Sequence, residues 1–223
     1  MKSRTRSTLL LAGLVLPLAV PSLTSCQSAY YAAMEKFGVH KRDILVDRVE
    51  EGREAQEEAQ EQFKTTYETF KELTGIDGGE LEAVYTRLNK EYERCVDEAG
   101  TVSDRIASIE AVADDLFREW EQEIGEFTNE DMARTSRESL ENTRRRSTEL
   151  VGLMRQAESR MEPVLAKFKD NVLFLKHNLN AQAIANLQDT VVDIGGDIDR
   201  LIADMERSIA EADEFIDSMS TEG

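Results

Sequence analysis

Residues 81–127 read LEAVYTRLNKEYERCVDEAGTVSDRIASIEAVADDLFREWEQEIGEF. Along this stretch, apolar side chains recur at alternating spacings of four and three residues, and only Glu123 interrupts the series. A 3.5-residue repeat sustained over so many turns predicts a helix that packs lengthwise against partner helices, as in a coiled coil. At 1.5 Å per residue this helix would be about 70 Å long. The apolar positions are Leu81, Tyr85, Leu88, Tyr92, Cys95, Ala99, Val102, Ile106, Ile109, Ala113, Leu116, Trp120 and Phe127.

Three further stretches carry the same repeat, at residues 41–74, 130–178 and 181–219. The glycine-rich residues 75–79 predict a turn, and Asn129 and Asn180 are suited to cap the third and fourth helices. Connections this short make successive helices antiparallel. We therefore expect an all-α fold, an elongated antiparallel up-down-up-down four-helix bundle or coiled coil over residues 41–219, followed by a tail at residues 220–223.

The first 26 residues have the character of an export signal. Residues 1–6 are basic, and residues 9–23 are apolar but interrupted by Pro17 and Pro21, which makes them too short and too broken to span a membrane. The segment ends in Leu23-Thr24-Ser25-Cys26, which resembles the lipobox of bacterial lipoproteins. The alternatives are an ordinary signal peptide and an uncleaved anchor, and Leu23 disfavours the ordinary cleavage pattern.

The lipobox resemblance implies a signal peptide at residues 1–25, lipid on Cys26, and a tether at residues 26–40. Gln27 follows the cysteine, whereas an aspartate there would suggest retention at the inner membrane in many Gram-negative bacteria. The resemblance thus favours a place in the bacterial cell envelope, at the outer membrane and facing the periplasm. Aromatic and basic residues in the tether could rest on the membrane surface or begin the first helix.

The charge of the chain argues against nucleic acid as a partner. Removing Lys2, Arg4 and Arg6 with the signal leaves 24 basic against 45 acidic residues, a net charge of −21. Residues 129–180 carry a net charge of +2, between neighbouring segments at −10 and −9. Counting back from the turn at residues 128–129 places the run Arg144-Arg145-Arg146 opposite Asp114 and Asp115, which predicts ion pairs between helices.

The sequence offers little for catalysis or for a cofactor. His40 and His177 are its two histidines, and neither follows a glutamate at the spacing of di-iron bundles. Cys95 has no partner once Cys26 carries lipid, and its place in the apolar repeat predicts a buried core thiol. We expect no metal, no cofactor and no enzymatic activity. His177, with Asn178 and Asn180, either caps the third helix or marks a partner site.

Four runs in the chain are distinctive: TGIDGGELEA (residues 74–83), DLFREWE (115–121), MEPVL (161–165) and LFLKHNLNAQAI (173–184). Together they are similar to a bacterial family known as domain of unknown function 2959. This resemblance covers most of the mature chain. It implies a secreted helical coiled coil, and it supplies no activity and no catalytic residues.

We expect a lipid-anchored scaffold or spacer that binds the membrane through Cys26 and an unidentified envelope protein. One alternative is a holdase-like chaperone, for which the fourth helix would expose an apolar strip. Another is an enzyme with an unrecognised site in a deep pocket. Self-association of the rods stays open.

Small residues on several helices predict one narrow level in the bundle. Counted from the turn at residues 75–79, Pro163 and the pair Gly195-Gly196 lie about fifteen residues away. Cys95, Ala99 and Gly100 lie fifteen to twenty residues away, and residues 52–59 are comparable. Glycine permits close approach of backbones, and proline removes a helix hydrogen bond. We expect a waist or kink there, with Cys95 facing inward.

Overall fold

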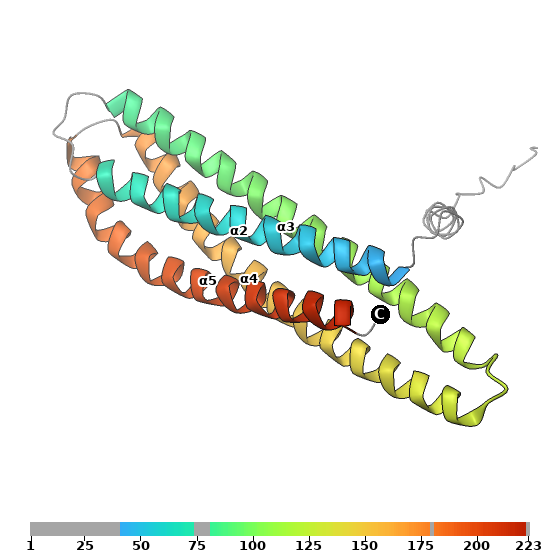
Figure 1. The fold of residues 1–223 in the computed structure, drawn as a ribbon. Coiled ribbons are helices and arrows are strands. Elements are labelled where there is room, and N and C mark those ends of the chain that lie inside the picture. Colours follow the sequence, from blue (N-terminus) through green and yellow to red (C-terminus); the bar gives the residue numbers. More distant parts are fainter. Residues whose placement is uncertain (1–40, 74–80, 179–180, 222–223) are drawn as a thin grey trace, which may run out of the picture. The chain divides into compact units, whose positions relative to one another are not determined.

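The computed structural model describes residues 41–73, 81–178 and 181–221, and in this part of the chain it consists of four helices. They are α2 (Lys41–Leu73), α3 (Leu81–Ile124), α4 (Glu130–His177) and α5 (Ala181–Thr221) (Figure 1). The predicted signal, Cys26 and the tether lie outside the described residues. The all-α four-helix bundle is confirmed, and α4, at 48 residues, is about 72 Å long.

The four helices form a closed ring of neighbours, in which α2 packs on α3, α3 on α4, α4 on α5 and α5 on α2. Each contact is antiparallel, because residue numbers rise along one helix as they fall along the next. Between α4 and α5, for example, Arg146 Nη2 donates to the backbone oxygen of Glu214 (2.9 Å), whereas Lys167 Nζ pairs with Asp193 (2.5 Å). The predicted up-down-up-down topology follows from this pattern.

The apolar repeat of α3 points into the bundle as predicted. Its residues Leu88, Cys95, Val102, Ile106 and Ile109 are buried. The other helices contribute matching layers, and Phe70 stacks on Phe168 with ring centroids 4.9 Å apart. Further buried side chains, from α2, α4 and α5, are Leu45, Val49, Ala59, Phe63, Leu150, Met154, Met161, Ile194, Leu201, Met205 and Phe215.

Three large apolar side chains, Phe127, Met132 and Val192, are exposed, and for Phe127 the predicted place in the apolar seam was wrong. Phe127 lies three residues beyond the end of α3, where hydrogen bonds from the backbone N–H groups of Gly125 and Glu126 to Gln122 and Glu123 close the last turn. Met132 belongs to the first turn of α4 and Val192 faces outward from α5. An apolar residue is buried only where another helix covers it. At a helix end, or on a face that no helix covers, it stays exposed to solvent.

The first turn of α4 is built as predicted. The Asn129 side chain accepts hydrogen bonds from the backbone N–H groups of Asp131 (3.0 Å) and Met132 (3.1 Å), and Asn129 is therefore the N-cap. Beside this turn, Trp120 Nε1 donates to Ser136 Oγ at 2.8 Å. A large residue on α3 thus meets a small one on α4.

The arginine run on α4 pairs differently from the prediction. Arg144 pairs with Glu121 at 2.8 Å, Arg145 donates to Asn142 on its own helix, and Arg146 reaches α5. Consecutive helical residues point about 100° apart, so the three cannot all face α3. Long helical side chains also lean toward the helix N-terminus, which brings Arg144 closer to the turn than counting suggests. The predicted partner Asp115 instead pairs with Arg118 at 2.8 Å.

The structure brings some of the residues of the predicted narrow level together. An added Cβ at Gly195 would lie 2.4 Å from the Tyr67 hydroxyl, and Cys95 Sγ lies 3.1 Å from Thr66 Oγ1. Gly195 and Cys95 therefore meet neighbouring residues of α2. Pro163 is close to this level, one turn before Lys167, within an uninterrupted α4.

Gly52 does not belong to this level, since it packs against Ile109 and Met154. The prediction that residues 52–59 contribute to the waist was wrong for Gly52. The waist prediction was also wrong for Gly100, which is exposed and has open space where a Cβ would lie. The fit of core side chains sets the register between neighbouring helices. Counting residues from the centre of a turn takes no account of that fit.

Candidate interaction surface

The α3–α4 hairpin extends past the other two helices at one end of the bundle (Figure 1). Lys41, the first residue of α2, pairs with Glu119 at 2.7 Å, and Arg42 donates to the backbone oxygen of Met219 near the end of α5 at 2.6 Å. The residues of α3 beyond Glu119 therefore have no α2 beside them. We call residues 120–136 the hairpin tip. It is held together by the Trp120–Ser136 hydrogen bond and the Asn129 cap.

The hairpin tip exposes two large apolar side chains among acidic ones. Phe127 is 41% exposed and Met132 is 55% exposed. Glu130 and Asp131 lie between them in sequence, Glu126 directly precedes Phe127, and all three acids are exposed. Single exposed apolar side chains are common, but two on one protruding turn, five residues apart in sequence, indicate a contact surface.

A groove of about 800 Å³ lies between α3 and α4, next to the hairpin tip. Phe117 is buried in its lining, and the guanidinium of Arg144 lies 5.2 Å from the centre of the Phe117 ring. A smaller cavity of about 270 Å³ continues it toward Gly125 and shares Glu121 and Arg144 with it. The larger groove is lined by Glu110, Ala113, Asp114, Phe117, Arg118, Glu121, Arg144, Ser147, Thr148 and Val151.

Charged groups close the far end of the groove. Arg155 donates to both carboxylate oxygens of Glu110, at 3.2 and 2.6 Å, and to Glu158 at 2.8 Å. These hydrogen bonds raise the pKa of Arg155. Burial alone would raise the pKa of Glu158, but hydrogen bonds from Arg155 and Ser103 outweigh it and lower that pKa. The cluster is fully paired and joins α3 to α4 across the groove.

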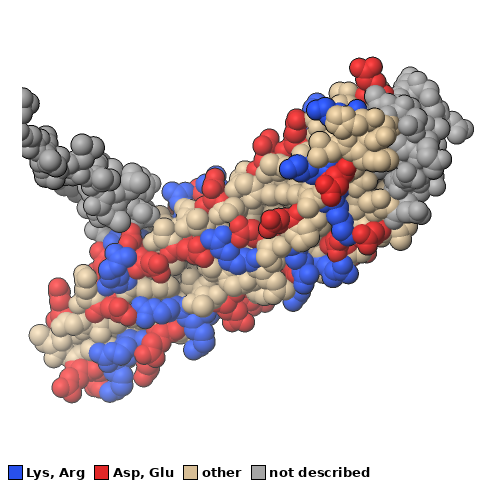
Figure 2. Space-filling view, turned by 180° about the vertical axis from the view of Figure 1, so that it is seen from behind, with Lys and Arg blue, Asp and Glu red and all other residues tan. Residues whose placement is uncertain are grey.

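Acidic and basic side chains alternate over the face of the bundle shown in Figure 2, where they do not separate into patches. On α5, the buried carboxylate of Asp204 accepts hydrogen bonds from Arg160, Gln156 and Arg207. Such pairs lock α4 to α5 in one register. Because Asp204 is buried, another register that removed its partners would leave a buried charge unpaired, which is costly.

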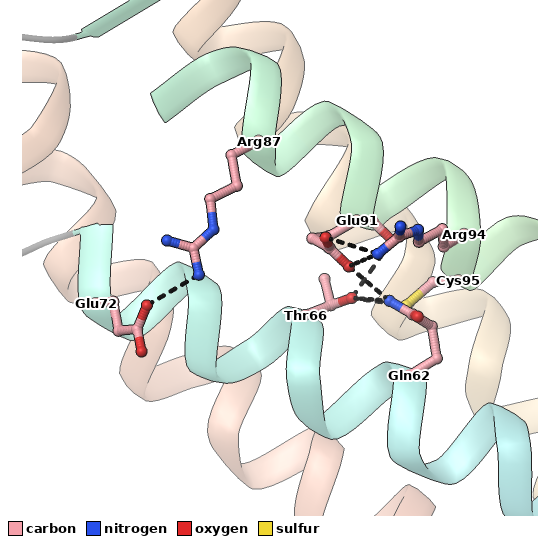
Figure 3. A network of polar contacts seen from close by, with 7 residues as sticks. All are labelled: Gln62, Thr66, Glu72, Arg87, Glu91, Arg94 and Cys95. Atoms are coloured by element: carbon pink, nitrogen blue, oxygen red, sulfur yellow. Dashed lines mark hydrogen bonds and ion pairs between the residues drawn. The ribbon is translucent and has the colours of Figure 1, made fainter. Parts of the chain in front are cut away.

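A polar network in the core surrounds Cys95 (Figure 3). Gln62 Nε2 donates to Thr66 Oγ1 at 3.0 Å and to Glu91 Oε2 at 2.9 Å, while Arg94 Nη1 donates to Glu91 Oε1 at 3.1 Å. Burial raises the pKa of the Cys95 thiol to about 12. The thiol is therefore neutral and a poor nucleophile, in agreement with the predicted core role.

The described residues include only part of the partner site predicted at the end of α4. His177 is exposed, and the residue that caps the helix is Asn178. Its backbone N–H donates to the oxygen of Leu175 (3.2 Å), and its side chain donates to the oxygen of Phe174 (2.9 Å). Asn180 lies outside the described residues, as does His40. A role of His177 in partner binding stays a prediction.

Sequence reasoning missed the hairpin tip and its groove. The unequal lengths of the helical stretches contained a signal, because α3 and α4 are longer than α2 and must extend beyond it at one end.

Among the described residues, no three His, Cys, Asp or Glu side chains are grouped to hold a metal ion. Within the same residues, no helix has both the length and the apolar character needed to cross a bilayer.

Comparison with known proteins identifies the family and nothing beyond it. No curated protein and no solved structure matches the chain at a meaningful level of similarity. Residues 30–219 match the family described as "Protein of unknown function (DUF2959)". Because this match covers nearly the whole chain, including all of α2, α3 and α4 and nearly all of α5, the protein belongs to that family.

Proposed function

We propose that the protein is a lipid-anchored structural or interaction protein of the bacterial cell envelope, a scaffold or spacer without catalytic activity. The observation that carries this proposal is the continuous core. Four helices of 33 to 48 residues pack on apolar layers along the described length. Such a bundle holds two ends apart at a set distance, which is what a spacer requires. The Leu23-Thr24-Ser25-Cys26 motif supports the lipid anchor.

The anchor is tested by replacing its cysteine. Cys26→Ser should leave the protein unlipidated, so that it appears in the soluble fraction or keeps its signal peptide. Mass spectrometry of the N-terminal peptide from the wild type should show acyl chains on Cys26. An unlipidated wild-type protein, or a lipidated Cys26→Ser variant, would contradict the lipoprotein assignment.

The interaction role is tested by photocrosslinking in living cells. A photoreactive residue at Thr148, on the exposed wall of the groove, should capture a discrete partner that mass spectrometry identifies. The same residue at Glu206, exposed on α5, is the matched control. Arg118→Glu, which inverts a charge on the groove wall, should reduce the capture. If neither Thr148 nor His177 yields a partner above the Glu206 control, the interaction role is contradicted.

The holdase alternative gains no support from α5. Its apolar residues Ile194, Ile198, Leu201 and Met205 are buried, and Ile202, Ile209 and Ile216 are half-buried. Over residues 190–220, Val192 is the large apolar side chain that stands exposed. The continuous apolar strip expected of a client-binding groove is not found there. Suppression of client aggregation by the purified protein remains the direct measurement for this class.

A further inference from the structure

We propose that the hairpin tip rests on the lipid surface that carries the anchor, with Phe127 and Met132 among the headgroups of a zwitterionic membrane. The proposal depends on the lipid anchor of the proposed function and adds an orientation to it. The hairpin tip would be the membrane-proximal end of the bundle. The α4–α5 end, with His177, would point away from the membrane toward partners.

The first step is a comparison of lengths. Fourteen residues lie between Cys26 and Lys41, and the chain from Cys26 to Lys41 spans at most about 50 Å whatever conformation it takes. The end of α3 lies only five residues beyond Glu119, the partner of Lys41, which corresponds to about 8 Å along the helix. The other end of α2 is 33 residues away, or about 50 Å. The anchor thus reaches the hairpin tip easily, and it reaches the opposite end only when fully stretched.

The second step is the shape of the membrane-proximal end. Both the start of α2 and the end of α5 are at the base of the hairpin tip, as the pairs Lys41–Glu119 and Arg42–Met219 show. The turn between α3 and α4 projects beyond them (Figure 1). When the bundle stands on its anchored end, this turn is the part that meets the surface first.

The third step is chemical. An aromatic and a thioether side chain in a polar turn suit the interface between headgroups and acyl chains. Glu126 and Glu130 would be repelled by anionic lipid, whereas the cationic ends of zwitterionic headgroups can pair with them. Asp131 already pairs with Arg134 at 2.8 Å. Two partly exposed side chains are too few to bind a membrane from solution. A tether removes that limit, because it keeps the tip at high effective concentration beside the lipid.

The chain contains its own reporter for this contact. Trp120 is its single tryptophan and stands at the base of the hairpin tip, half-buried against Ser136. The purified lipoprotein, reconstituted into phosphatidylcholine vesicles with nitroxide-labelled headgroups, should show strong quenching of Trp120 fluorescence. In a Trp120→Phe, Phe174→Trp variant, the tryptophan moves to an exposed site near the other end of α4. Its quenching should be several-fold weaker.

A second pair of variants separates contact from mere proximity. The double change Phe127→Glu, Met132→Glu should lower the quenching of Trp120 by more than half, whereas Val96→Glu, at an exposed site distant on α3, should not. Replacing part of the phosphatidylcholine by phosphatidylglycerol should also lower it. Unchanged quenching in the double variant would overturn the contact.

The remaining outcomes are also decisive. Equal quenching of the two tryptophan positions would show a bundle lying flat and would overturn the orientation. Quenching that depends on the protein-to-lipid ratio would show that the tip meets a second copy. A lipoprotein that floats with vesicles but shows no quenching of Trp120 overturns this proposal alone. A protein that does not float with the vesicles contradicts the anchor itself.

Discussion

At the scale of single residues, a buried polar pair lies between α2 and α5. Gln56 on α2 is fully buried, and its Oε1 accepts a hydrogen bond from Ser208 Oγ on α5 at 2.5 Å. Among the described residues, the Gln56 Nε2 group finds no partner. Ser208 Oγ also lies 3.0 Å from the backbone oxygen of Met205. A buried polar residue in a helical seam is best known for selecting one register among several, at some loss of stability.

The two partners should therefore respond unequally to mutation. Ser208→Ala leaves both ends of the buried amide unpaired and should lower the free energy of unfolding by about 1–3 kcal/mol. Gln56→Leu removes the unpaired amide, while Ser208 keeps its bond to Met205, so stability should stay equal or rise. Urea titrations of both variants check this. The interpretation is wrong if Gln56→Leu costs as much as Ser208→Ala.

The thiol of Cys95 should be inert in the folded protein. It is fully buried, its pKa is raised to about 12 by burial, and thiol reagents require an exposed thiolate. In the Cys26→Ser background, a thiol reagent at pH 8 should therefore label Cys95 only after denaturant is added. Adding Val96→Cys places a thiol at the neighbouring, partly exposed position as the control, which should label at once. Rapid labelling of Cys95 without denaturant would contradict its burial.

At the scale of elements, two adjacent glycines of α5 have opposite surroundings. A Cβ at Gly195 would meet the Tyr67 hydroxyl at 2.4 Å, which is well inside contact distance. A Cβ at Gly196 would find Arg200 Nη1 at 3.8 Å, an ordinary contact. Gly195 therefore permits the close approach of α5 to α2, and Gly196 only weakens the helix.

Substitutions at these glycines should separate packing from helix propensity. Gly196→Ala should raise the free energy of unfolding by about 0.5–1 kcal/mol, the usual penalty of glycine inside a helix. Gly195→Ala should gain less, because the Tyr67 hydroxyl must move. Gly195→Leu should overpack the seam and lose about 1–3 kcal/mol. Adding Tyr67→Phe to Gly195→Ala should recover part of the missing gain. Equal gains for both alanine variants in urea titrations would refute the close contact.

At the scale of the whole molecule, the acidic surplus crowds carboxylates together on the surface, and two of them contribute to the pH dependence of stability. The pKa of Glu98 is raised by burial and by the nearby carboxylates of Glu58 and Asp97. The pKa of Glu211 is raised by burial and by Glu149 and Glu214. A carboxyl whose pKa is higher in the folded state binds protons more readily there than in the unfolded chain. Its charged form thus destabilises the fold at neutral pH, and stability rises as pH falls through the folded pKa.

Neutralising one of these acids should therefore stabilise the bundle at neutral pH. Glu98→Gln should raise the free energy of unfolding at pH 7 by a few tenths of a kcal/mol, because solvent screens the repulsion. The gain should shrink as the pH falls through the raised pKa of Glu98, where the wild-type carboxyl takes up its proton. Glu206→Gln, at an exposed site on α5, is the comparison variant. Urea titrations across this pH range check the trend, and a gain that does not change with pH would contradict repulsion as its cause.

Much of the architecture was predictable because it is periodic. The 3.5-residue repeat of residues 81–127 requires an apolar seam, and Leu88, Cys95, Val102 and Ile109 are buried along it. Asn129 was recognisable as a cap because its side chain acts on backbone groups two and three residues away. Both features depend on interactions within one helix or one turn, so the local sequence contains all that they need.

The sequence by itself determined the number of helices, their antiparallel order and which faces are apolar. Only the tertiary structure decided the register between helices. Register placed Arg144 against Glu121 and Gly195 against Tyr67, and it left Phe127 and Met132 in solvent on a protruding tip. The physical reason is that periodicity is the same after a shift of one repeat. The choice among such shifts depends on how particular side chains from different helices fill one another's space, and that fit exists only once the chain has packed.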